Sequence, residues 1–183
     1  MRGERGYRTV KAMTSATKFK LPKAIASSLQ ASFLTKADSK RPAIELEGGA
    51  WLLLAQLGPV VISDEDVAFV AHWHEIQHAV WEAGSQMLII RWVDPTREPW
   101  HGVTLEDDVR RFMSQLEEFI EYTYISTTSR KTADGTWIRA SIRRSSNGNL
   151  FSTLTAGGDL DNEGEKLAFE LERNLRESVG LER

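Results

Sequence analysis

The chain has 183 residues, of which 41% are hydrophobic and 27% charged, with a net charge of −3 and no cysteine. This length suits one domain with a real hydrophobic core, and the composition is that of an ordinary globular protein. The lack of cysteine excludes disulfides, a thiol nucleophile and a thiolate metal site, and no apolar run reaches the ~18 residues of a membrane-spanning helix.

The charges are unevenly distributed along the chain. Residues 1–43 carry ten basic and two acidic residues, whereas residues 44–122 carry four basic and fifteen acidic ones. The basic residues are dispersed, which favours a solvated segment over an arm that binds nucleic acid. We expect a flexible basic extension over residues 1–20 and a single domain over residues 21–183. No secretory apolar region follows the start, so we expect a cytoplasmic protein without a membrane partner.

The first third of the chain predicts one helix followed by short strands. Apolar residues recur at helical spacing over residues 21–36. The pair Gly48-Gly49 then predicts a tight turn between two strands, with a further short strand over residues 60–62. A short buried helix is the alternative for the very apolar residues 51–57.

The strongest helix signals lie in residues 63–83. Ser63 can cap the N-terminus, three acidic residues follow it, and Gly84 can end the helix. The apolar residues with helical spacing in this segment are Phe69, Trp73, Ile76 and Val80.

The rest of the chain predicts a strand, a helix, three more strands and a last helix. These elements span residues 87–93, 104–121, 122–127, 136–144, 150–155 and 161–178. Asp134-Gly135 and Asn147-Gly148 separate the last three strands and are typical of hairpin turns. The predicted fold class is therefore α+β, in the order α-β-β-α-β-α-β-β-β-α, with an antiparallel β-meander near the C-terminus packed with helices.

Residues 74–78 spell His-Glu-Ile-Gln-His inside the predicted helix. Side chains four positions apart lie one above the other on a helix, so His74 and His78 can bind one Zn²⁺. Glu75 would then act as general base for the metal-bound water. A third protein ligand is needed, for which His101 is the best candidate. The alternative is that both histidines pack at a helix edge and Glu75 is a solvated surface residue.

This motif resembles that of the zincin metallopeptidases, in which apolar residues follow the second histidine as Ala79 and Val80 do here. The resemblance covers about ten residues, and no downstream motif marks a third ligand. It implies a zinc-dependent peptidase with Zn²⁺ as its cofactor.

A second candidate site lies on one face of the strand over residues 136–144. Trp137, Arg139 and Arg143 share this face, because side chains alternate along a strand. An aromatic ring among arginines can stack on bases and hold phosphates. It also suits a protein interface, and a polar outer face is normal for an antiparallel sheet.

Three functions remain open from the sequence. The leading interpretation is a non-catalytic binding module of the adaptor type, with a protein partner and no cofactor. The alternative is a zinc-dependent metallohydrolase that uses Glu75. A weaker alternative is nucleic-acid binding through the face with Trp137, Arg139 and Arg143.

Overall fold

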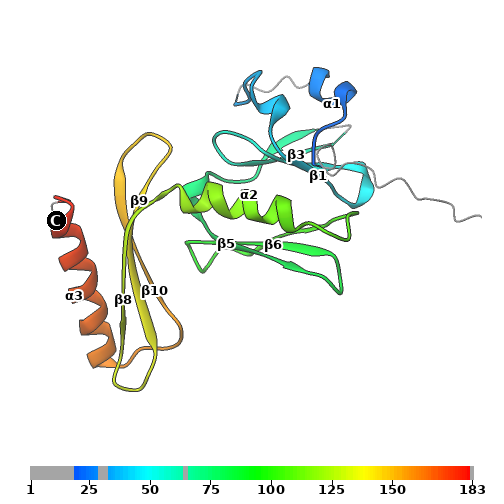
Figure 1. Ribbon diagram of the computed structural model, residues 1–183. Helices are drawn as coiled ribbons and strands as arrows, with labels where there is room; N and C mark the ends of the chain where they lie inside the picture. Colours follow the sequence, from blue (N-terminus) through cyan, green and yellow to red (C-terminus); the bar gives the residue numbers. More distant parts are fainter. Residues whose placement is uncertain (1–18, 29–32, 64–65, 182–183) are drawn as a thin grey trace, which may run out of the picture.

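The computed structural model describes residues 19–28, 33–63 and 66–181 (Figure 1). Within these ranges the chain is mostly β, with ten strands in three antiparallel sheets and three α-helices. The fold class predicted from the sequence is therefore wrong, both in its balance of helix and strand and in the order of elements. Most of the predicted extension, residues 1–18, lies outside the described residues.

The first sheet lies near the N-terminus and has the order β1-β2-β3-β4. Its strands are β1 (Ala43–Glu45), β2 (Trp51–Leu54), β3 (Pro59–Ile62) and β4 (Val67–Phe69), preceded by α1 (Lys23–Ser28) and the 3₁₀ helix η1 (Asp38–Lys40). The 3₁₀ turn η2 (Glu47–Gly49) joins β1 to β2, and both of its glycines have positive φ, 80° and 78°. The helix predicted over residues 21–36 is wrong in length, since residues 33–36 are not helical. Its residues 29–32 lie outside the described ranges.

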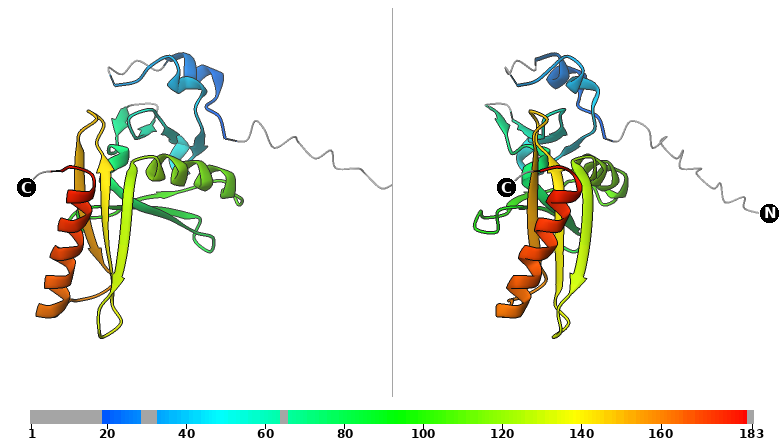
Figure 2. Two further views of the ribbon diagram at one scale, coloured as in Figure 1. Left: turned by 60° about the vertical axis from the view of Figure 1, so that its left-hand side comes forward. Right: turned by 90° about the vertical axis from the view of Figure 1, so that its left-hand side faces the viewer.

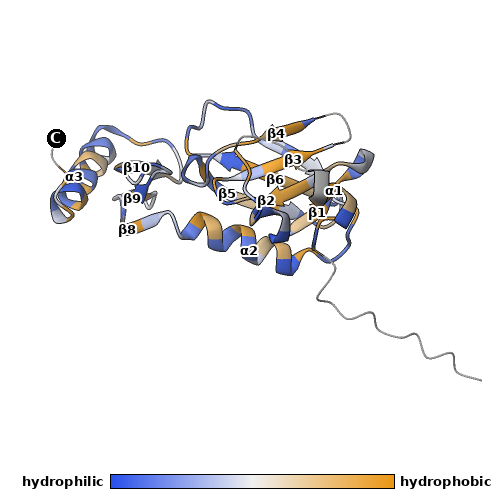
Figure 3. Cartoon of the chain, turned by 90° about the horizontal axis from the view of Figure 1, so that it is seen from above, coloured by the Kyte–Doolittle hydropathy of each residue, from blue (hydrophilic) through white to orange (hydrophobic). Residues whose placement is uncertain are grey.

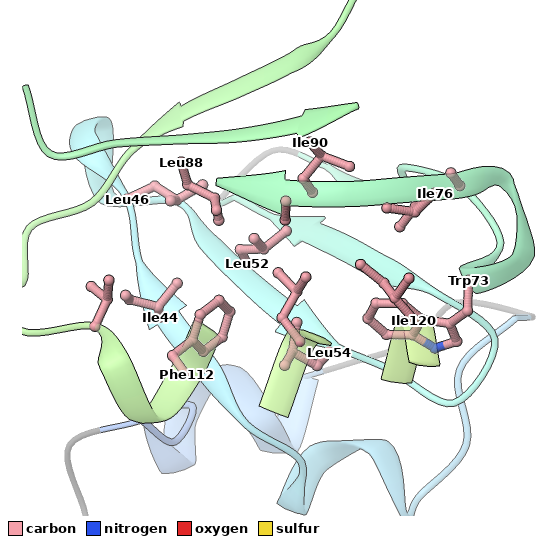
Figure 4. Packing of buried hydrophobic residues seen from close by; sticks show 14 of the residues in the cluster. Ile44, Leu46, Leu52, Leu54, Trp73, Ile76, Leu88, Ile90, Phe112 and Ile120 are labelled. Atoms are coloured by element: carbon pink, nitrogen blue, oxygen red, sulfur yellow. The ribbon is translucent and has the colours of Figure 1, made fainter. Parts of the chain in front are cut away.

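The second sheet has the order β5-β6-β7 and is covered by α2. Its strands are β5 (Ile76–Glu82), β6 (Met87–Trp92) and β7 (Trp100–Val103), and α2 spans Arg110–Glu121. Figure 4 shows the main core, in which apolar side chains of the first two sheets meet those of the helix. The labelled members are Ile44, Leu46, Leu52, Leu54, Trp73, Ile76, Leu88, Ile90, Phe112 and Ile120. Burying each such side chain contributes about 1.5–3 kcal/mol relative to leaving it in water.

In the described part of the predicted helix 63–83, no α-helix forms, and β4, the 3₁₀ turn η3 (Trp73–Glu75) and β5 take its place. Residues 64–65 lie outside the described ranges. A β-bulge between Ile76 and His78 shifts the register of β5 against β6. As a result the inward residues of β5 are Ile76, Ala79 and Trp81. They are spaced by three and then two positions in the sequence, in place of the regular two. Pairing with the strongly apolar β6 outweighs the local helix signals, because strand preference depends on partners more than on local sequence.

The third sheet, with the order β10-β9-β8, is covered by the C-terminal helix (Figures 1 and 2). It comprises β8 (Tyr124–Lys131), β9 (Trp137–Arg144) and β10 (Leu150–Ala156), and α3 spans Asn162–Ser178. Seen from above in Figure 3, α3 and this sheet lie beside the rest of the molecule. One apolar cluster joins them, with buried members Ile138, Ala140, Ile142, Ala168, Leu171 and Leu175. The face of the sheet opposite α3 therefore carries the alternate residues of each strand.

Asp161 caps the N-terminus of α3, since its carboxylate accepts a hydrogen bond of 2.7 Å from the backbone N–H of Gly164. Within the described residues, no helix has the length and apolar character needed to cross a membrane.

Candidate functional site

The two histidines of the His-Glu-x-x-His motif lie on different elements. His74 is in the turn η3, whereas His78 is an exposed residue of β5 opposite Arg91 on β6. His101, the predicted third ligand, is exposed on β7 opposite Ile89. Because the helix is absent, the stacking of two imidazoles over one helical turn is lost. Among the residues that the structure describes, no three histidine or carboxylate side chains are grouped so that they could hold a metal ion.

Glu75 holds the turn together. One of its carboxylate oxygens accepts a hydrogen bond of 2.7 Å from the backbone N–H of His72, and the other lies 3.9 Å from Arg97 Nη1. The backbone N–H of Glu75 donates to the carbonyl of His72 at 3.0 Å. These contacts orient the residues on either side of His74.

A row of rings links β4 to β10 through the turn. The ring of His72 is edge-on to Phe69 at 4.9 Å and stacked on His74 at 5.3 Å, and His74 is edge-on to Phe151 at 5.6 Å. Burial lowers the pKa of His74, and the positive charges of His72 and Arg143 act in the same direction, against the effect of Glu75. The pKa of His78 is also lowered, by burial and then by Arg91.

Arg143 is the buried link between the third sheet and the rest of the molecule. Its guanidinium donates hydrogen bonds to the carbonyl oxygens of Ile76 at 2.8 Å and Trp73 at 3.1 Å, and to Thr123 Oγ1 at 2.6 Å. It also lies over the ring of Tyr124, 4.4 Å from the centroid. The prediction that this arginine belongs to an open binding face is therefore wrong, since its exposed fraction is 0%.

Trp137 and Arg139, the other two predicted residues, are exposed on the face opposite α3. Trp137 is 59% exposed, and Lys131 Nζ lies 5.6 Å from its ring centroid. Arg139 lies between Ser129 on β8 and Thr155 on β10. We call the part of this face formed by Thr127, Ser129, Lys131, Trp137, Arg139, Thr153 and Thr155 the open face; Ser141, between Thr127 and Thr153, is buried. The three strands that build it contain five basic and no acidic residues.

Two cavities lie on either side of His74. The first, of about 230 Å³, is lined by the carboxylates of Glu75 and Asp94 and by Arg97, which lies 3.7 Å from the ring centroid of Trp92. The second, of about 270 Å³, lies between η3 and the turn after β9, and among the described residues that line it, Arg144 carries a permanent charge. The two cavities therefore differ in the charge of their walls.

No signal in the sequence indicated the second cavity. Its wall combines Gln56, which follows β2 closely, with Tyr122 and with residues 144–146 at the turn after β9. The hairpin signal at Asn147-Gly148 predicts only that residues 144–146 lie at the end of β9. The rest depends on the docking of the third sheet through Arg143.

Comparisons of the chain with protein-family models, with curated proteins and with solved structures gave no match.

Proposed function

We propose that this protein is a non-catalytic binding module that holds an acidic protein partner on the open face. The observation that carries the proposal is the exposure of Trp137 beside Lys131 and Arg139 on a sheet face that no acidic residue shares. Tryptophan and arginine are enriched at the centres of protein interfaces. A cytoplasmic location, expected from a chain without cysteine, is part of the same proposal.

The chemistry of the open face supports this choice of partner. Lys131 and Arg139 have no ion pair with a carboxylate in the described part of the chain, so an acidic surface would supply complementary charge. The hydroxyls of Ser129 and Thr155, on either side of Arg139, can donate hydrogen bonds to carboxylates or to a partner's backbone. The open face thus combines an aromatic anchor with donors, which is typical of an interface.

The residues of the His-Glu-x-x-His motif favour binding over hydrolysis. Glu75, the predicted general base, is engaged with the backbone of His72 and lies near Arg97. His74 packs against Phe151, and His78 lies on a separate strand. The contacts of Glu75 and His74 thus stabilise the turn η3 and its packing against β10.

A binding experiment with matched variants tests the proposal. A polyglutamate peptide is titrated into the full chain, and binding is followed by isothermal titration calorimetry, whose signal does not depend on Trp137. We expect saturable binding that Trp137→Phe with Arg139→Gln weakens at least about tenfold. The control, Phe169→Leu with Arg173→Gln, changes an exposed aromatic residue and an arginine on α3, and it should bind like the unchanged protein.

Single-stranded DNA in a parallel titration tests the nucleic-acid alternative. DNA binding that falls steeply with salt and needs Arg139, without peptide binding, would replace the proposal by that alternative. Equal loss of peptide binding in both double variants would contradict a role for the open face.

A further inference from the structure

The second cavity brings together polar side chains from three distant parts of the chain. Gln56 comes from the end of β2, His74 from η3, and Arg144 and Ser146 from the end of β9. Tyr122 and Trp73 add aromatic walls. The cavity lies away from the open face, so it is a separate feature of the fold.

Several of these polar groups have no partner within the part of the chain that the structure describes. The guanidinium of Arg144, the amide of Gln56, the hydroxyl of Ser146 and the imidazole of His74 make no hydrogen bond or ion pair there. Two neighbours in the same wall are engaged, by contrast. Thr123 Oγ1 donates to the carbonyl of Ile120 at 2.7 Å, and Ser145 Oγ donates to that of Asn149 at 2.9 Å. Gln56, Arg144 and Ser146 are exposed side chains, so their donors are open to solvent and to a ligand.

The charge around the cavity is positive. Arg144 lies in its wall, and none of the described residues that line it carries a carboxylate. Arg143 lies directly behind the wall, since its guanidinium donates to Thr123 Oγ1 at 2.9 Å from Nε and at 2.6 Å from Nη2. Among the described residues, no carboxylate forms an ion pair with either arginine. Arg143 makes no direct ion pair, and the Glu121 carboxylate acts on it only through space. Its buried positive charge still attracts an anion nearby, because the local dielectric constant is low.

We infer that this cavity binds a small organic compound through an oxyanion group, either phosphoryl or carboxylate. Arg144 can bind two oxygens of such a group with parallel hydrogen bonds, and Ser146 and Gln56 can donate to the same group. The volume of about 270 Å³ is close to the lower end of the range for small-ligand sites, roughly 300 Å³. The ligand is therefore one anionic group with a short body that packs against Trp73 and Tyr122.

The inference does not rest on the proposed function, and a separate measurement tests it. The full chain labelled with ¹⁵N is titrated with phenyl phosphate, benzoate and inorganic phosphate at constant ionic strength, and amide shifts are followed by NMR. We expect saturable shifts at Gln56, His74 and residues 144–146. The comparison of phenyl phosphate with benzoate decides which oxyanion is preferred, and saturable binding of either at these residues supports the site.

Two exposed arginines provide the matched variants. Arg144→Gln should weaken binding at least about tenfold, because it removes charge-assisted hydrogen bonds. Arg173→Gln removes an exposed arginine of α3 outside the cavity and should leave binding unchanged. Ser146→Ala should weaken binding a few-fold. The inference is overturned if none of the three compounds gives saturable shifts at the cavity, or if Arg144→Gln binds like the unchanged protein.

Discussion

Arg143 on β9 donates a hydrogen bond of 2.8 Å to the backbone carbonyl of Ile76, where β5 begins. These two residues are 67 positions apart in the sequence. The same guanidinium reaches the carbonyl of Trp73 in η3. One side chain thus fixes the third sheet against the turn that carries His74, and it also sets the positive wall of the second cavity.

Removing this guanidinium should destabilise the fold. In Arg143→Met, the carbonyls of Ile76 and Trp73 and the hydroxyl of Thr123 lose a buried donor, and a buried polar group without a partner costs about 1–3 kcal/mol. We expect the free energy of unfolding to fall by about 3 kcal/mol or more, measured by urea denaturation. The control Arg139→Met, an exposed position on the same strand, should change it by less than about 0.5 kcal/mol. Similar small changes in both variants would show that Arg143 does not secure this junction.

His74 should make the stability depend on pH. Its pKa is lowered in the folded protein by burial, by His72 and by Arg143, so the unfolded chain binds a proton more readily. The stability that the folded protein has while His74 is neutral is therefore fully present above the unfolded pKa of 6.5. It is lost as the pH falls through the folded pKa. Between about pH 8 and about pH 5, the free energy of unfolding measured in urea should decrease less in His74→Gln than in the unchanged protein.

A neighbouring variant controls for this measurement. Gln77→Ala changes a residue of the same segment without removing an ionisable group, so it should keep the pH dependence of the unchanged protein. An identical dependence on pH in His74→Gln and in the unchanged protein would argue against a titrating role for this imidazole.

The bulge in β5 explains why sequence reasoning failed in the middle of the chain. The predicted helical face included Ile76 and Val80, but Val80 is 44% exposed. The bulge makes Ile76, Ala79 and Trp81 the inward residues of β5 instead. Gly84 follows β5 in the turn to β6, where sequence reasoning placed the end of a helix. A bulge is set by pairing with another strand, and that pairing is not visible in a local window.

The turns near the C-terminus were more predictable, because their signals are local. Gly135 and Gly148 have φ values of 96° and 88°, which glycine adopts at little cost, and both lie in the hairpin turns of the third sheet. Alternation along β9 also placed Trp137 and Arg139 on one face. It did not indicate that Arg143, on that same face, is buried, because burial there depends on contact with η3 and β5.

The separation of His74 from His78 leads to a prediction about metal. We expect the protein, purified without a histidine tag, to keep its melting temperature within about 1 °C on treatment with EDTA, because the described residues do not group three side chains that could hold a metal ion. Its zinc content should not depend on His74. Zinc at about one atom per chain that disappears in His74→Ala would instead support the zinc-dependent hydrolase.

The close approach of Gly58 to the backbone near β4 gives the sharpest test of the fold itself. A Cβ atom at Gly58 would lie 1.7 Å from the carbonyl oxygen of Ala71 and 2.9 Å from its carbonyl carbon. These are backbone atoms next to the hydrogen bond of 3.2 Å from Trp73 N–H to the carbonyl of Leu57, so they cannot move aside without breaking it. Gly58→Ala should therefore lower the free energy of unfolding by about 3 kcal/mol or more.

Gly84 provides the matched control for this substitution. A Cβ atom there has no neighbour within 4 Å in the described structure, and its φ is not positive. Gly84→Ala should therefore be neutral or stabilise the protein by up to about 1 kcal/mol, because alanine reduces the entropy of the unfolded chain. The two variants are compared by thermal and urea denaturation. If Gly58→Ala were as stable as Gly84→Ala, residues 57–58 would not lie against residues 71–73, and the position of η3 beside the second cavity would have to be revised.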